Sequence, residues 1–328
     1  MTEAVPLPFC CGIYIGRFQP PHRAHLLVMQ EALTQVQTLL ICVGSAGAAR
    51  SAKNPFTAQE RISIIRAMLA EAGVDLGRVQ FTALPDHPYD EARWLASVRR
   101  AALDLCPTGQ PALIGHIKDD SSYYLRSFPE WPFLPTHVES PLSATDVRRA
   151  LFEDDLGRVS GMVTPAVQTW LTQWRGQPEF ARLAAEYAAL RGVSPDVQLG
   201  VYGAVLRGHQ VLLARETGPV GQGLLRLPGG PLRPGLSLRG SLSADLAALA
   251  TLPGTETALA AAALTVYDAP GRSPAGREVA HVYRVPLAAG ADEAGEPWFN
   301  LPDILTRPEL FWADHHAILE AQAAGGAA

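Results

Sequence analysis

Two histidines and an arginine lie close together near the start of the chain, in the segment GRFQPPHRAH at residues 16–25. A turn between a strand and a helix is where α/β proteins bind phosphates, because free backbone N–H groups meet the positive end of the helix dipole. Arg17, His22 and His25 would add side-chain donors. Two histidines three residues apart also suit a metal pair or an exposed helix start, but the flanking elements favour a nucleotide.

The elements around this segment follow a βαβ pattern. Residues 10–15 and 38–44 are apolar runs typical of buried strands, and residues 25–34 between them have a helical pattern. Thr57 and Glu60 form a capping-box pattern at the start of a helix over residues 57–72. We therefore predict a Rossmann-like, doubly wound parallel sheet in the N-terminal half. Further elements are expected at residues 79–83 and 112–115 (strands) and at residues 91–105, 165–174 and 178–190 (helices).

The pattern changes after residue 190. Residues 197–206 and 210–214 alternate like antiparallel strands around a turn at residues 207–209, and residues 281–287 read as a further strand. Residues 238–252 are rich in Ala and Leu and predict a helix. The sequence thus predicts an α/β domain at residues 1–190 and a smaller α+β domain at residues 191–328.

Residues 16–25 resemble the H-x-G-H signature of the nucleotidylyltransferase superfamily, in its form G-x-F-x-P-x-H-x-G-H. Ala24 replaces the glycine of that motif, which we expect to be tolerated if its φ is negative. Several later segments, in the right order, are similar to nicotinamide mononucleotide (NMN) adenylyltransferases of the archaeal type. These are residues 54–61 (NPFTAQER), 84–89 (LPDHPY) with Trp94, 115–125 (GHIKDDSSYYL) and 143–148 (SATDVR).

The resemblance covers roughly residues 10–185 and implies transfer of AMP from ATP to NMN, which yields NAD and pyrophosphate. It implies catalytic roles for His22, His25 and Arg148. Mg²⁺ would be held by phosphate oxygens and waters, with no metal ligand from the protein in this domain. The implied ATP-binding residues are Gly16, Arg17, Phe18, Gly115, His116, Lys118, Ser143 and Thr145, and the implied NMN-binding residues are Asn54, Arg61, Asp86 and Trp94.

Three of these residues also fit ordinary structural roles. Trp94 suits the buried face of an amphipathic helix, and Asp86 suits a turn. Arg148 stands beside Arg149 and would equally suit a helix surface.

In the second half, the segment LPGG at residues 227–230 resembles the entrance to the Nudix box, G-x5-E-x7-R-E-U-x-E-E-x-G-U, where U is apolar. Anchored on Gly230 after Gly229, the box keeps its apolar positions but only one acidic one, Asp245. A Nudix hydrolase needs clustered carboxylates to hold Mg²⁺ and activate water. We therefore predict a Nudix fold without hydrolase activity. The other box positions hold Leu236, Ala244, Leu246, Ala248, Leu249 and Thr251.

Two further segments are similar to ADP-ribose-type Nudix domains. Residues 267–277 resemble a loop before a late strand, and its Arg272 and Arg277 would either bind the phosphates of a dinucleotide or remain exposed loop arginines. Residues 311–316 resemble the start of the C-terminal helix, where we interpret His315 and His316 as helix-start residues.

Composition and charge narrow the classes of protein to which the chain could belong. The net charge of −5 gives no general electrostatic footprint for nucleic acid, and no apolar run is long enough to span a bilayer. The N-terminus lacks a signal-peptide pattern, so we expect a cytoplasmic enzyme. The four cysteines are expected to be free, buried thiols. A homo-oligomer is compatible with the family and with Ala/Leu-rich helix faces, although such faces also form ordinary cores.

Three other functions stay open from the sequence. The acceptor could be nicotinate mononucleotide or another phosphate. A non-catalytic sensor of NAD-family nucleotides is a second alternative, although a pure sensor has no need of groups aimed at an α-phosphate. The third is a bifunctional enzyme with an active ADP-ribose pyrophosphatase.

Overall fold

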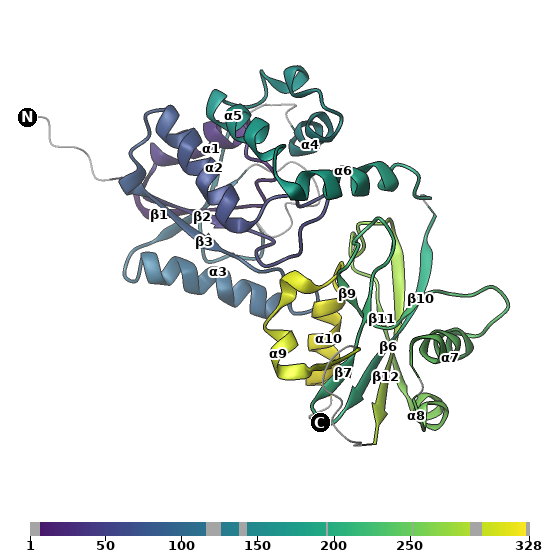
Figure 1. Cartoon of the computed structure of the whole chain (residues 1–328). Coiled ribbons are helices and arrows are strands. Elements are labelled where there is room, and N and C mark those ends of the chain that lie inside the picture. The colour runs from purple at the N-terminus through teal and green to yellow at the C-terminus, as the bar shows by residue number, and fades with distance from the viewer. Residues whose placement is uncertain are drawn as a thin grey trace, which may run out of the picture. The chain divides into compact units, whose positions relative to one another are not determined.

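The computed structural model describes residues 7–115, 126–137, 143–194, 196–250, 252–288 and 297–325. The chain divides into two compact units, Met1–Ala184 and Ala185–Ala328 (Figure 1). The division falls inside helix α6 (Pro178–Leu190), whose Leu183 belongs to the core of the first unit. Within the ranges described, no helix has the length and apolar character needed to cross a membrane.

The first unit is built on a five-stranded parallel sheet with the order β3-β2-β1-β4-β5. The chain runs outward from β1 in one direction to β2 and β3, and in the other direction to β4. The carboxyl ends of β1 and β4 therefore flank a topological switch point, where open α/β sheets bind their ligands. The strands are β1 (Phe9–Gly16), β2 (Val36–Val43), β3 (Val79–Ala83), β4 (Pro111–Gly115) and β5 (Phe133–Pro135).

Helices cover both faces of this sheet, with α1 and α2 on one side and α3 on the other (Figure 1). Alternate residues of β2 explain this, because Ile41 and Val43 enter the core under α1 and α2 whereas Leu40 and Cys42 enter the core under α3. The predicted doubly wound sheet is confirmed. The helices are α1 (Arg23–Leu33), α2 (Ala58–Glu71), α3 (Glu91–Leu105), α4 (Ala144–Phe152), α5 (Pro165–Trp174) and α6.

Helix α2 begins as its sequence predicts. The Glu60 backbone N–H donates to Thr57 Oγ1 at 3.2 Å, and the Thr57 N–H donates to Glu60 Oε2 at 2.8 Å. This reciprocal pair satisfies N–H groups that have no partner inside the helix.

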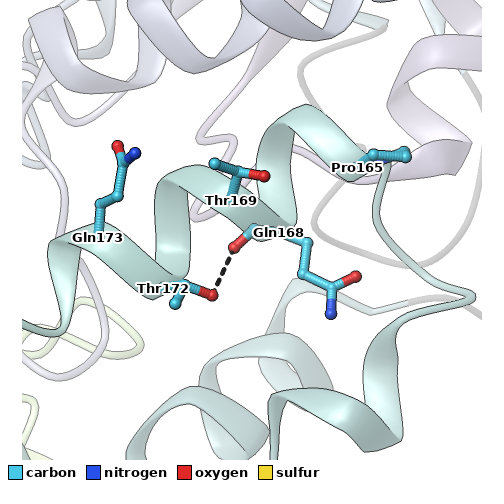
Figure 2. A pocket seen from close by; sticks show the side chains of 5 residues that line it. All are labelled: Pro165, Gln168, Thr169, Thr172 and Gln173. Atoms are coloured by element: carbon cyan, nitrogen blue, oxygen red, sulfur yellow. Dashed lines mark hydrogen bonds between the residues drawn. The ribbon is translucent and has the colours of Figure 1, made fainter.

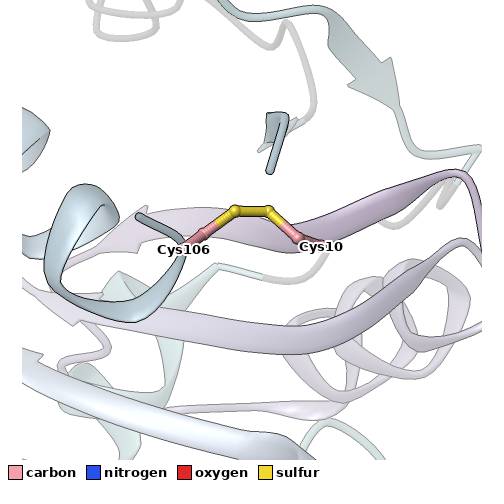
Figure 3. The surroundings of a disulfide bond; sticks show 2 residues. All are labelled: Cys10 and Cys106. Carbon is pink, nitrogen blue, oxygen red and sulfur yellow. A yellow bond between two sulfur atoms is a disulfide. The ribbon is translucent and has the colours of Figure 1, made fainter. Parts of the chain in front are cut away.

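The expectation of four free cysteines is wrong for two of them. Cys10, near the start of β1, forms a disulfide with Cys106 directly after α3, and their Cα atoms are 6.2 Å apart (Figure 3). Gly109 leaves room for the bridge, because a Cβ there would lie 2.6 Å from Cys10 Sγ. Cys11 and Cys42 are buried and free, as expected. Spacing in the sequence gave no sign of the pair, since it joins residues 96 positions apart.

The second unit contains a six-stranded mixed sheet with the order β11-β12-β6-β7-β13, and β10 also pairs with β6. The predicted antiparallel hairpin of β6 and β7 is confirmed, but β12 lies parallel to β6. Helices α7 and α8 pack on one face around Leu242, Leu246 and Leu259. The strands of this sheet are β6 (Gln198–Arg207), β7 (Gln210–Leu212), β10 (Gly229–Pro231), β11 (Ala263–Tyr267), β12 (Glu278–Leu287) and β13 (Trp298–Asn300), and β8 (Ala214–Arg215) pairs with β9 (Leu225–Arg226) in a separate two-stranded sheet.

The helices of this unit differ from the sequence prediction in two ways. The Ala/Leu-rich helix α7 (Leu238–Leu249) ends three residues before the predicted end at residue 252, and a second helix, α8 (Thr255–Ala261), follows after Gly254, which has a φ of 80°. Two further helices, α9 (Leu301–Leu305) and α10 (His315–Ala324), complete the unit.

Candidate active site

The loop after β1 is held in shape by Phe18. This residue is 2% exposed and has a φ of 51°, in the left-handed region that costs energy for a residue with a side chain. Its ring lies over Gly16, where an added Cβ would meet the ring at 2.7 Å. Gly16 is therefore required by the packing of the loop itself. The ATP-binding role that the resemblance implies for Gly16 stays a prediction.

His22 and His25 lie against each other at the start of α1. Their ring centroids are 3.8 Å apart, and the His22 backbone N–H donates to His25 Nδ1 at 3.1 Å. An accepting Nδ1 means that neutral His25 carries its proton on Nε2, so Nε2–H is the donor of that ring. Phe18 packs edge-on against the same ring, with centroids 5.0 Å apart. The two rings are thus fixed at the switch point of the sheet.

Arg148 reaches this loop from helix α4. Its Nη1 donates to the Gln19 carbonyl oxygen at 2.6 Å, and its Nη2 donates to Thr145 Oγ1 at 3.1 Å. The N–H of Thr145 donates to Ser143 Oγ, the side chain that caps α4. Residues 129 positions apart are therefore brought together. Ala24, which replaces a motif glycine, lies in α1 and not at positive φ, the condition under which we expected it to be tolerated.

Arg61 is a buried clamp beneath the same loops. Its guanidinium donates to the carbonyl oxygens of Arg17 and Gly44, both at 2.6 Å, and to that of Ser45 at 3.3 Å. Burial lowers the pKa of Arg61 to about 10. These bonds join the carboxyl ends of β1 and β2, so Arg61 positions the loops around the site. A direct contact of Arg61 with NMN stays a prediction.

The other predicted NMN-binding residues lie in the loops after β2 and β3 and on α3. Asp86 Oδ1 accepts a hydrogen bond from the Ser45 N–H at 3.2 Å, and its side chain is exposed. Asn54 has a buried Oδ1 with no hydrogen-bond partner in the described part of the chain. Trp94 is half-buried on α3, where it packs beside Phe128 with centroids 6.2 Å apart.

One predicted segment is only partly described. Gly115 ends β4, the strand that pairs with β1 at the switch point, and its carbonyl oxygen accepts from the Thr136 N–H at 3.0 Å. His116 and Lys118 lie outside the described residues.

Sequence reasoning missed Lys53, a half-buried residue in the loop between β2 and α2. Burial lowers the pKa of its amine, and the positive charges of Arg17 and Arg148 lower the pKa further, whereas Asp86 raises it. Its place directly before residues 54–61 was the only signal in the sequence.

Comparison with known proteins agrees with this geometry. A family model described as cytidylyltransferase-like matches residues 13–150. A nicotinamide/nicotinic acid mononucleotide adenylyltransferase of Acinetobacter baylyi is 39% identical over 143 residues, which are 43% of this chain and 74% of the relative. A nicotinamide-nucleotide adenylyltransferase of Pyrobaculum neutrophilum is 36% identical over 44% of this chain and 78% of its own length.

The chain belongs to the nicotinamide-nucleotide adenylyltransferase family. Its first unit is the nucleotidyltransferase domain. A bifunctional NMN adenylyltransferase/ADP ribose pyrophosphatase from Francisella tularensis shares the fold of both units, with a TM-score of 0.84 and 24% identity over 96% of this chain and 99% of that one. The second unit of this adenylyltransferase family member therefore has the Nudix fold, as its sequence indicated.

The remnant of the Nudix box holds one acidic side chain, and an arginine binds that side chain. Asp245 on α7 accepts from Arg233 Nε at 3.0 Å and from Arg233 Nη2. Gly229, with a φ of 133°, brings its backbone against β6, where a Cβ would lie 2.1 Å from the Val201 carbonyl oxygen. Gly230 also pairs with Val201 in the sheet. Both glycines and Asp245 thus have structural roles.

The two loop arginines of this unit, Arg272 and Arg277, also bind groups of the protein itself. Arg272 is buried, with its Nη2 2.7 Å from Asp314 Oδ1 and its Nη1 3.0 Å from Glu278 Oε2. The alternative of an exposed loop arginine is therefore wrong for Arg272, because two carboxylates neutralise it in the interior. Arg277 donates to the Asp268 carbonyl oxygen at 2.7 Å.

In the first unit, a shallow groove lies on the exposed side of α5 (Figure 2). All of its lining comes from one helix, and Thr172 Oγ1 donates to the Gln168 carbonyl oxygen at 2.9 Å. None of its lining residues is one of the predicted site residues: they are Pro165, Gln168, Thr169, Thr172 and Gln173.

Proposed function

We propose that the first unit transfers AMP from ATP to nicotinamide mononucleotide, giving NAD and pyrophosphate. The observation that carries this proposal is the convergence of His22, His25 and Arg148 on one loop at the switch point of the sheet. Family membership supports it, because the named relatives are adenylyltransferases for this class of acceptor.

The reaction asks for little covalent work from the protein. An oxygen of the NMN 5′-phosphate forms a bond to the α-phosphorus of ATP, and the bond from that phosphorus to the oxygen bridging the α- and β-phosphates breaks. Pyrophosphate leaves with that electron pair. Catalysis then consists of positioning and of donors aimed at the oxygens where negative charge grows.

The donors of this site fit that task. His25 Nε2–H would donate to an α-phosphate oxygen, since its Nδ1 is already held by the His22 backbone. Arg17 and Arg148 would pair with the remaining phosphate oxygens, and Thr145 would present the N-terminal turn of α4 to the same group. Asn54, Asp86 and Trp94 would surround the mononucleotide.

We assign Mg²⁺ as the metal that accompanies ATP. Clusters of carboxylates are absent from the described residues, and the one group of potential ligands there is Cys10, Cys11 and Cys106. A nucleotide site without clustered carboxylates suits a hard cation that is held by phosphate oxygens and waters. Mg²⁺ would supply neutralisation of phosphate charge. The related Francisella protein has been solved with AMP and a manganese ion, which supports a divalent metal.

Product formation by the full-length protein tests the proposal. The protein would be given ATP and Mg²⁺ with NMN or nicotinate mononucleotide in parallel, because the Acinetobacter relative is named for both acceptors. We expect NAD with an equal amount of pyrophosphate. His25→Ala should lower kcat about 100-fold, as loss of a preorganised donor does. The matched control is His137→Ala, an exposed histidine of the same unit that pairs with Glu31.

Two results would contradict this proposal. A folded protein that binds ATP but forms neither dinucleotide would point to a sensor or to another acceptor. Unchanged turnover in His25→Ala would remove His25 from the mechanism.

We further propose that the Nudix-fold unit does not hydrolyse ADP-ribose. Its one surviving box carboxylate, Asp245, is bound by Arg233, and the clustered carboxylates of an active box are missing. Full-length protein should release no AMP from ADP-ribose with Mg²⁺ or Mn²⁺. Arg233→Ala, which frees Asp245, should remain inactive because one carboxylate cannot hold the metal cluster. Hydrolysis by the unmodified protein would establish a second active site.

A further inference from the structure

Three cysteines meet at the amino end of β1, in what we call the cysteine cluster. The sulfur atoms of Cys10, Cys11 and Cys106 all lie within 4.8 Å of one another. Cys10 and Cys11 lie near the start of β1, and Cys106 directly follows α3. The length of β1 puts these sulfurs roughly 20 Å from the loop after this strand, so the proposed adenylyl transfer does not use them.

Backbone contacts hold the cysteine cluster in place. The Cys10 N–H donates to the Gln110 carbonyl oxygen at 3.3 Å, and the Cys106 N–H donates to the Ala102 carbonyl oxygen at 2.9 Å. A Cβ at Gly109 would lie 2.6 Å from Cys10 Sγ and 2.8 Å from Cys106 Sγ. The turn between α3 and β4 therefore leaves to the sulfurs a space that any residue with a side chain would fill.

The disulfide accounts for two of the three sulfurs. Cys11 is a free thiol beside the Cys10–Cys106 bridge, and it is buried among apolar side chains such as that of Leu113. A small aliphatic side chain would serve the packing at this position equally well. What the thiol of Cys11 adds is a third soft ligand atom next to the two sulfurs of the bridge.

The cluster has the ligand atoms and the spacing of a thiolate metal site. Zn–S bonds are about 2.3 Å long, so two sulfurs on one tetrahedral ion lie about 3.8 Å apart. Once the bridge is broken, side-chain rotation can bring all three sulfurs to this separation. Among the described residues, no histidine or carboxylate belongs to the group. Sulfur ligands alone select thiophilic cations over hard ones such as Mg²⁺.

We propose that the reduced cysteine cluster binds one thiophilic divalent cation, Zn²⁺ or a close analogue, through Cys10, Cys11 and Cys106. The same sulfurs then hold either the disulfide or the cation. Breaking the bridge takes two electrons and two protons from an external dithiol, which is oxidised to its own disulfide. The cation replaces the protons of the three thiols. Because the cluster joins β1 to α3, the cation maintains this link when the bridge is absent.

Metal titration of the full-length protein tests this inference. The protein is reduced under nitrogen with a water-soluble phosphine, which takes an oxygen atom from water while the bridge becomes two thiols, and the excess phosphine is removed. Cd²⁺ is added while the ultraviolet charge-transfer absorption of cadmium–thiolate bonds is recorded, and Zn²⁺ is then tested by displacement. We expect one ion per reduced chain and no such absorption in the oxidised protein. Histidine ligands give no cadmium–thiolate band, so an ion bound at His22 and His25 is not counted.

Two matched variants locate the ion. Cys11→Ala removes the third ligand and leaves both sulfurs of the bridge. Cys42→Ala removes the other buried free thiol, which lies outside the cluster. We expect Cys11→Ala to weaken Cd²⁺ binding at least about tenfold, because loss of a partner behind a ligand already costs roughly 10–100-fold. Cys42→Ala should bind Cd²⁺ as the unmodified protein does.

Three results would overturn this inference. Reduced, unmodified protein without the charge-transfer band has no thiolate site, and this comparison needs no variant to fold. Unchanged affinity in Cys11→Ala would mean that Cys11 is not a ligand. Equal losses in Cys11→Ala and Cys42→Ala would mean that the position of the thiol in the cluster does not set the affinity. None of these readouts involves NAD formation, so the inference is tested separately from the proposed function.

Discussion

The buried Arg61 clamp gives the sharpest stability prediction. Arg61 is 1% exposed, and its guanidinium bonds the carbonyl oxygens of Thr57, Arg17, Gly44 and Ser45. Arg61→Met keeps an unbranched side chain of similar reach but removes every one of these donors.

The expected loss follows from the carbonyl groups left behind. The bonds to Arg17 and Gly44 are the two short ones, at 2.6 Å. An acceptor left unsatisfied in the interior costs about 1–3 kcal/mol, while removal of a buried charge offsets part of that loss. We expect a net loss of about 3 kcal/mol in the free energy of unfolding. For a unit of this size that corresponds to a melting temperature lower by roughly 6–12 °C.

The assay is thermal unfolding, measured together with turnover. Arg61→Met should also lose activity, because the clamped loops carry Arg17 and approach Asp86. The matched control is Arg66→Met on the same helix, an exposed arginine whose guanidinium lies over the Phe81 ring at 4.7 Å. Its loss should cost less than about 1 kcal/mol.

Two results would refute this reasoning. A loss in Arg61→Met no larger than that in Arg66→Met would mean that the carbonyl oxygens find other partners. An inactive Arg61→Met with full stability would point to a direct contact with substrate.

Two further predictions concern the disulfide and His315. Reduction of the Cys10–Cys106 bridge, or Cys10→Ser, should destabilise the first unit by about 4 kcal/mol, because the bridge closes a loop of 96 residues; equal melting temperatures with and without reductant would contradict this. His315 is buried beside Arg272 and Arg226, so desolvation, then the two arginines, hold its pKa well below 6.5. The unfolded chain then binds the extra proton, and stability should fall as pH drops below about 6.5. His315→Phe should flatten that dependence in melting curves recorded between about pH 7 and about pH 5, and an unchanged slope would count against it.

Local patterns predicted most elements of the first unit. The bounds of β3, α3, α5 and α6 agree with the sequence analysis, and the capping box of α2 has the expected bonds. These elements have strong apolar periodicity or explicit start signals, which depend on near neighbours alone.

The second unit was harder to predict because its strands are short and depend on distant partners. Strand β11 has exposed residues along most of its length, so it lacks the alternation that marks a half-buried strand. The parallel pairing of β12 with β6 joins residues about 80 positions apart and carries no local signal.

By itself, the sequence determined which chemistry is present. The segment at residues 16–25, with its strand before and helix after, predicts a phosphate site, and the absence of most box carboxylates can be read from the sequence alone. Residue type and short spacing suffice for both conclusions, because they concern groups on one element or one turn.

Only the tertiary structure decided how these groups act together. It bound Arg61 to the carbonyl oxygens of two loops, joined Arg148 to Gln19 and paired Cys10 with Cys106. Each of these facts depends on a contact between residues far apart in the chain. Such contacts arise from the packing of whole elements, so no local pattern contains them.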